Sequence, residues 1–238
     1  MNIKEILVSS IKKGFLDLTG VDDYYIFWTV ENGRLRLSSY VIAHKSSTLA
    51  TIEVKDFYLP DSVSVIRDPG RLMKLINITG DNLSVSIDDN RMKLEDGNFD
   101  MEFVLCDPNT ITIRVPDIEE PISYDLTIDL TDEFVNRYIA AKSANNTEIV
   151  SVEVADRQAK FELGEANGYT NKIKFSVTLD GIFNMERLLF SSDVIEEILK
   201  RNKGTQGKLY VCEEGLMKIQ YMDGTIKSTY FLVALDKL

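Results

Sequence analysis

The sequence predicts an α+β protein made of two similar halves, each with antiparallel strands and two helices. A short amphipathic helix, a run of strands, a second short helix and further strands occur in the same order twice along the chain. A turn-rich stretch from Pro108 to Pro121 separates the two occurrences. The 238 residues suit two domains of ordinary size. We expect these domains at 1–115 and 123–238, joined by a connector at 116–122.

The first half is expected to begin with a helix. Residues 3–11 carry apolar side chains at helical spacing, and Gly14 lies where this helix would end. Asp68-Pro69 is a typical helix start, and apolar residues recur behind it at helical spacing up to Ile76. Apolar or alternating runs predict strands at 24–30, 34–42, 48–54, 83–87, 91–95 and 99–106, with hairpin turns at 31–33, 88–90 and 96–97.

The second half repeats this pattern after an extended connector. Residues 107–121 contain three prolines and several acidic residues, which favour extended backbone over helix. Thr131, followed by two acidic residues, is good capping chemistry for a helix, and another helix is expected from about Ser192 to Lys203. Strands are expected at 124–130, 148–155, 158–164, 171–179, 208–212 and 216–235, with a turn inside the last run at Asp223-Gly224.

The composition is ordinary for a soluble globular protein. Hydrophobic residues make up 44% and charged residues 27% of the chain, and no apolar run approaches the roughly 18 residues of a membrane span. Charged residues interrupt the first apolar positions, which is unlike a secretory signal. Cys106 and Cys212 lie in apolar strand-like runs, which favours buried thiols in a reducing compartment over a disulfide. We therefore expect a cytoplasmic protein without membrane association.

The charges are unevenly distributed along the chain. The net charge of −11 argues against unselective binding to nucleic acid, because an acidic surface repels phosphate. Windows 3–13 and 66–79, around the first two predicted helices, each carry two excess positive charges, whereas 131–143 and 192–204 are neutral. Two interpretations are open. The last two helices place acids early and bases late, as the helix dipole favours, whereas the excess over all four windows suggests helices that share one electropositive face.

No catalytic or metal-binding motif in this sequence is convincing. His44 is the single histidine, so no pair of histidines can hold a metal, and a Ser-His-Asp triad is poorly supported. Residues 204–208 are too few for a phosphate-binding loop and follow a helix, so a turn is expected there. Asp22-Asp23 and Asp88-Asp89 lack the ligand spacing of a calcium loop. The sequence therefore predicts no enzyme activity, no cofactor and no metal.

Four segments of the chain resemble DNA polymerase sliding clamps. They are DPGRLMKLINIT at 68–79, LSVSIDD at 83–89, NKIKFSVTL at 171–179 and STYFLVALD at 228–236. Together with the doubled unit, they make the whole chain similar to the two-domain clamps of T-even-like bacteriophages and, more distantly, to proliferating cell nuclear antigen. The resemblance implies a homotrimeric ring in which each domain places two helices inside and antiparallel sheets outside.

The same resemblance implies a processivity function without catalysis. Such a ring encircles double-stranded DNA independently of sequence, is opened by an ATP-driven clamp loader, and tethers the replicative DNA polymerase. The polymerase docks through a short C-terminal peptide in an apolar pocket between the domains. For a phage protein, the expected location is the cytoplasm of the host cell.

The resemblance also implies two sets of functional residues. The expected DNA-facing residues are the bases on and beside the four helices: Lys4, Lys12, Lys13, Arg71, Lys74, Arg137, Lys142, Lys200, Arg201 and Lys203. The expected partner-binding residues come from the connector and the closing strand, with residues 44–49 as a further candidate segment: Val115, Pro116, Ile118, Tyr230, Phe231 and Leu232.

An alternative is a β-rich structural or assembly protein of viral origin that does not encircle DNA. In that case the duplication would build a symmetric shell or adaptor. The basic helices would then be ordinary solvated faces.

Overall fold

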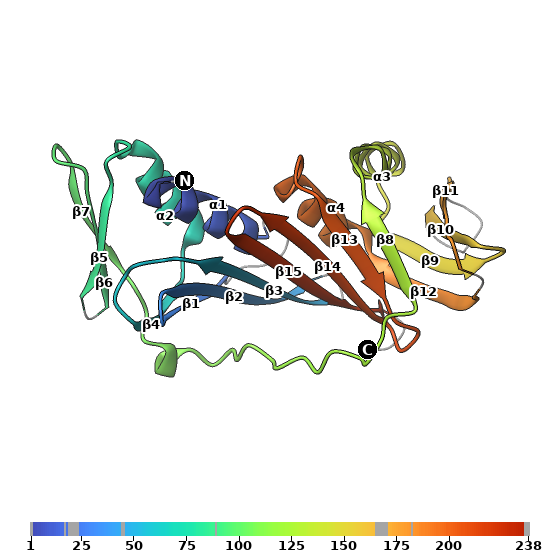
Figure 1. Cartoon of the computed structure of the whole chain (residues 1–238), viewed down its shortest axis with the longest axis horizontal. Helices are drawn as coiled ribbons and strands as arrows, with labels where there is room; N and C mark the ends of the chain where they lie inside the picture. Colours follow the sequence, from blue (N-terminus) through green and yellow to red (C-terminus); the bar gives the residue numbers. More distant parts are fainter. Residues whose placement is uncertain are drawn as a thin grey trace.

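The computed structural model confirms the expected α+β fold (Figure 1). Within the part of the chain that it describes, four α-helices and one short 3-10 helix alternate with fifteen strands. The described residues are 2–16, 18, 24–43, 46–88, 90–164, 171–181 and 183–235.

Two helices and seven strands form the first half in the expected alternation. Asn2 caps the first helix, because its side chain accepts a hydrogen bond from the backbone N–H of Glu5 and the Glu5 carboxylate accepts one in return. Asp68 caps the second helix by accepting a hydrogen bond from the backbone N–H of Arg71 at 2.8 Å. The elements are α1 (Ile3–Gly14), β1 (Ile26–Glu31), β2 (Arg34–Ala43), β3 (Ser46–Lys55), β4 (Ser62–Ile66), α2 (Pro69–Ile78), β5 (Ser84–Asp88), β6 (Arg91–Glu95) and β7 (Asp100–Val104).

The second half follows a connecting segment without regular structure at 111–125. Thr131 and Ser191 cap the two helices of this half with their hydroxyl groups. The 3-10 helix η1 (Pro108–Thr110) precedes the connecting segment. The elements after the segment are β8 (Leu126–Leu130), α3 (Asp132–Asn145), β9 (Ile149–Ala155), β10 (Gln158–Leu163), β11 (Ile173–Thr178), β12 (Met185–Ser191), α4 (Ser192–Arg201), β13 (Gly207–Val211), β14 (Leu216–Asp223) and β15 (Ile226–Val233).

Strands β4 and β12 are missing from the sequence-based expectation. Both precede the second helix of their half and pair with the strand that directly follows the first helix of that half, β1 and β9 respectively. Neither has clean alternation of buried and exposed residues: β4 ends in three consecutive buried residues, and the register of β12 shifts between Met185 and Leu188. A shift of this kind breaks the period of two on which strand prediction depends.

One sheet crosses from the first half to the second. Its eight strands run in the order β4-β1-β2-β3-β15-β14-β13-β8, so the seam between the halves is the antiparallel pair β3 and β15. The pairing extends from Ile226 opposite Val54 to Leu232 opposite Thr48. An ion pair of 3.5 Å between Lys227 and Glu53 crosses the same seam. Backbone pairing therefore fixes the two halves relative to each other.

Two smaller sheets and a row of helices complete the fold. The second half adds a sheet of order β11-β10-β9-β12, and the first half adds the three-stranded sheet β5-β6-β7. In Figure 1 the helices α2, α1, α4 and α3 lie in a row along one side of the molecule, and the connecting segment runs along the opposite side. Helix α1 packs against both α2 and α4, so the row is continuous across the seam.

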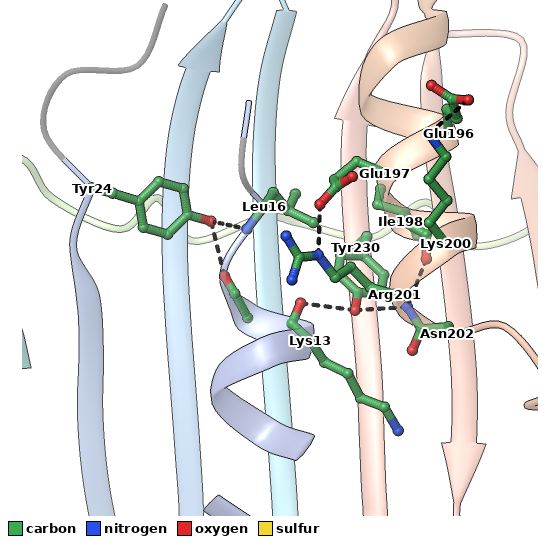
Figure 2. A network of polar contacts seen from close by, with 11 residues as sticks. Lys13, Leu16, Tyr24, Glu196, Glu197, Ile198, Lys200, Arg201, Asn202 and Tyr230 are labelled. Carbon is green, nitrogen blue, oxygen red and sulfur yellow. Dashed lines mark hydrogen bonds and ion pairs between the residues drawn. The ribbon is translucent and has the colours of Figure 1, made fainter. Parts of the chain in front are cut away.

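A buried polar network ties the end of α1 to the second half (Figure 2). The Tyr230 hydroxyl on β15 donates to the Lys13 carbonyl at 3.0 Å and accepts from the Asn202 side chain at 2.9 Å. Asn202 also donates to the Ile198 carbonyl in α4. The Tyr24 hydroxyl accepts from the Leu16 amide at 2.8 Å, and burial raises the pKa of Tyr24 to about 12. These hydrogen bonds hold α1 and α4 in fixed positions at the seam.

Candidate nucleic-acid interface

The basic residues expected to face DNA fall into three groups: held in buried ion pairs or a helix contact, paired with a glutamate of the same helix, or exposed without an ion pair. All ten lie on or directly after the four helices that form the row. Their side chains nevertheless differ in exposure and in ion pairing. Only part of the expected set therefore remains available for phosphate.

The expectation that Lys13 and Lys142 face outward is wrong. Lys13 is 4% exposed, and its Nζ lies 2.7 Å from the carboxylate of Asp223 on β14. Lys142 is 5% exposed, and its Nζ lies 2.7 Å from the carboxylate of Asp193 in the first turn of α4. Both ammonium groups are buried because each joins two elements through an ion pair.

Three further bases are neutralised by glutamates one turn earlier in the same helix. Each pair has the i, i+4 spacing that stabilises isolated helices. In the second half, the helix-dipole interpretation therefore accounts for the order of charges better than a shared positive face does. The pairs are Arg137 with Glu133 at 2.6 Å, Lys200 with Glu196 at 2.9 Å, and Arg201 with Glu197 at 2.6 Å.

Lys4 has a structural contact of another kind. Its side chain is half-buried, and its Nζ donates a hydrogen bond to the carbonyl of Thr79, the residue that ends α2. A cation is favourable at this position because the last carbonyls of a helix carry partial negative charge. Lys4 thus links α1 to α2.

Four bases remain exposed without an ion pair among the described residues: Lys12, Arg71, Lys74 and Lys203. Lys12 lies near the end of α1, which packs against the helices that carry or precede the other three. Three of these four bases belong to α1 and α2, where Glu5 is the single acidic residue. These exposed bases without an ion pair are thus concentrated on the first half, and Lys203, just after α4, is the one from the second half.

Two residues expected to bind a partner lie in the core instead. Tyr230 and Leu232 are both fully buried, and the Tyr230 hydroxyl belongs to the network at the seam. Side chains alternate along a strand, so Phe231 points to the other face of β15. The Phe231 side chain is 8% exposed there, with Leu49 and Lys218 as its cross-strand neighbours. The prediction is therefore wrong for Tyr230 and Leu232. Of the three expected residues on β15, Phe231 alone lies on the face away from the helices.

The connecting segment covers part of the face on which Phe231 lies. Lys218 forms an ion pair of 2.5 Å with Glu120 of the segment, and its Nζ also lies 4.6 Å from the centre of the Tyr124 ring. Val115, Pro116 and Ile118 are half-buried. Residues 44–45, including His44, lie outside the described residues, whereas Leu49 is buried on β3.

The other motifs singled out in the sequence lie mainly in turns or outside the described residues. The turn expected at 204–208 lies at 202–205, with Gly204 at a φ of +81°, whereas Gly207 and Lys208 begin strand β13. A side chain at Gly207 would meet the Tyr221 ring, because its Cβ would lie 2.4 Å from ring atoms. No cluster of three or more candidate metal ligands is found in the described part of the chain. Asp22, Asp23 and Asp89 lie outside it.

None of the helices in the described ranges is both long and apolar enough to pass through a bilayer. The two cysteines are not joined: Cys212 is buried and Cys106 is half-buried, each as a free thiol.

Comparison with solved structures supports the clamp-like fold. A chain in the structure of the C-terminal region of FEN-1 bound to A. fulgidus PCNA superposes with a TM-score of 0.72. The alignment covers 98% of this chain and 96% of that chain at 18% sequence identity. No protein-family model and no curated protein matches the sequence. The expected fold is confirmed, and the finer assignment to phage clamps stays a prediction.

The exposed bases give a direct prediction for DNA binding. Substituting Lys12, Arg71, Lys74 and Lys203 together by Gln should weaken binding to a short DNA duplex. The slope of log K against log salt concentration should fall by about 0.9 for each phosphate that the variant no longer neutralises. Fluorescence anisotropy over a salt series measures both quantities.

The matched control is the pair Arg137→Gln and Lys200→Gln, which removes bases already neutralised by glutamates. This control should change the slope less per substituted base. An equal effect per base in the two variants would show that DNA does not distinguish the free bases from the paired ones.

Proposed function

We propose that three copies of this chain form a closed ring that encircles duplex DNA and tethers a replicative DNA polymerase. The ring is a processivity factor rather than an enzyme, and an ATP-driven loader opens it around DNA. For a phage clamp, this takes place in the cytoplasm of the host. The observation that carries the proposal is the equivalence between the seam inside the chain and the two strand edges left open at its ends.

The seam provides the pattern for the contact between subunits. In the first half β3 is the third strand after α1, and in the second half β11 is the third strand after α3. Likewise β15 and β7 are each the third strand after the second helix of their half. Strands β3 and β15 pair inside the chain, whereas β7 and β11 each end a sheet. Pairing β7 of one copy with β11 of the next would repeat the seam head to tail, as ring closure requires.

The side chains of the two open edges are complementary. Asp100 begins β7 and has no ion pair among the described residues. Lys174 on β11 and Lys172 directly before it both bind Glu162, at 2.8 and 3.2 Å, and lower the pKa of that carboxyl. Two cations on one carboxylate leave positive charge at this edge. Val104 adds an apolar contact surface on β7, where its side chain is 69% exposed.

In the proposed ring, the exposed bases of the helix row would contact DNA. The helix row would line the hole, so exposed bases would approach the phosphates of an enclosed duplex, while the excess of acids elsewhere repels other nucleic acid. Contacts to phosphate carry no sequence information, which permits sliding. Enclosure supplies retention, and a tethered polymerase then has a raised effective concentration at the primer end.

We predict that Val104→Glu prevents ring assembly. A carboxylate brought into a strand-to-strand interface without a partner would lose its hydration, which should weaken assembly roughly tenfold or more. The unassembled chain should stay folded because this side chain is already exposed. Sedimentation should show the wild type at three times the 27.0 kDa chain mass and the variant at the chain mass.

Val63→Glu is the control for this prediction. Val63 is 63% exposed on β4, which ends the large sheet at an edge that the proposed ring does not use. This variant should assemble like the wild type. If both variants assemble equally well, β7 is not a subunit contact.

Polymerase docking is assigned to the face of β15 that carries Phe231 and the connecting segment. Ile118→Ala combined with Phe231→Ala should weaken binding of the polymerase C-terminal peptide roughly tenfold, because anchoring apolar side chains supply most of the binding energy in small interfaces. Ile122→Ala is the control, since Ile122 in the same segment is fully exposed. Calorimetry with the peptide measures the effect. Unchanged binding by the double variant would exclude this docking face.

A further inference from the structure

The outer edge of β5 is a strand edge that the proposed ring leaves open. Strand β5 ends its sheet, and its one strand partner among the described residues is β6. Asp88 pairs with Arg91 across two intervening residues, so this pair is the hydrogen-bonded pair that closes the hairpin. The alternate residues Val85 and Ile87 therefore direct their backbone N–H and C=O groups away from β6.

In the second half, the strand edge equivalent to the outer edge of β5 is covered by another strand. Strand β13, which follows α4 as β5 follows α2, carries the short strand β8 along the corresponding edge. Leu126, Ile128 and Leu130 of β8 are buried, whereas the residues between them are exposed. Lys208 of β13 forms an ion pair of 3.2 Å with Asp129 of β8. An alternating five-residue strand with a matched charge is thus sufficient to cover this kind of edge.

The buried residues of β5 and β13 show which positions on the two strands correspond. Val85 and Ile87 on β5 point into the core side of their sheet, as Leu209 and Val211 do on β13. Ile128 lies opposite Leu209 and Leu126 opposite Val211. A strand bound to β5 in the same way would place apolar side chains opposite Val85 and Ile87. Ile87 is only half-buried, so such a strand would remove apolar surface from water.

The charges of β5 select the kind of strand. Exposed Ser84 and Ser86 lie along the strand, and exposed Asp88 lies at its end without an ion pair among the described residues. No base on β5 corresponds to Lys208 of β13. An acidic strand such as β8 itself would therefore be repelled, whereas a basic residue opposite Asp88 would be attracted.

We propose that the free edge of β5 binds an extended segment of a partner protein by β-strand addition. The segment has apolar residues at alternate positions, opposite Val85 and Ile87, and a basic residue opposite Asp88. Main-chain hydrogen bonds supply affinity, and the alternate side chains supply specificity. Because the proposed subunit contact uses β7, at the other end of the same sheet, this site is available whether the chain is assembled or not.

A synthetic peptide based on β8 tests the proposal. The probe has the sequence of residues 123–131 with Asp125→Lys, because the alignment places position 125 opposite Asp88. Amide hydrogen exchange followed by NMR should show slower exchange of the Val85 and Ile87 amides when the peptide is added to the whole chain. A peptide with serine at the three apolar positions should give no protection.

Asp88→Lys provides the charge-reversed control. This variant should bind the lysine peptide roughly two- to fivefold more weakly and should prefer the unmodified sequence of residues 123–131. The Val104→Glu variant should bind the lysine peptide like the wild type, which separates this site from ring assembly. Absence of protection on β5, protection on β13 alone, or an unchanged preference in Asp88→Lys would overturn the proposal.

Discussion

Backbone pairing between β3 and β15 is the constraint on which the arrangement of this molecule depends. It joins two similar halves into one eight-stranded sheet, so their relative orientation is set by hydrogen bonds along a whole strand rather than by a flexible linker. The Tyr230 network adds a second fixed connection at the ends of α1 and α4. As a result, four helices form one continuous row, and β7 and β11 are left as open edges at opposite ends.

In the helix row, folding and the proposed DNA binding would compete for the same residue types. A lysine that joins two elements through a buried ion pair, such as Lys13 with Asp223, loses its hydration and cannot also reach phosphate. For a base one turn after a glutamate, the neighbouring carboxylate offsets most of the positive potential felt at a distance. The remaining free bases lie mainly on α1 and α2, so the two halves are similar in fold and different in electrostatics.

Sequence periodicity predicts most helices and strands because capping residues, hairpin turns and apolar spacing are local signals. Long-range contacts are what it misses. Nothing near Lys13 in the chain indicates that Asp223, 210 positions away, will neutralise it. The closing strand ends in four consecutive apolar residues, 230–233, so the sequence there shows no period of two that would reveal that Tyr230 faces the core and Phe231 the opposite side. The equivalence of the seam and the open edges also requires knowing which strands are neighbours.

The proposed ring would hold DNA by enclosure. The most direct measurement compares retention on circular and linear DNA. Protein loaded onto a nicked circular plasmid by its clamp loader should remain bound through a wash at a salt concentration that abolishes its binding to short duplexes. It should leave when a restriction enzyme linearises the plasmid. Equal retention on circular and linearised plasmid would exclude enclosure, because a protein held by surface contacts alone does not sense the ends of DNA.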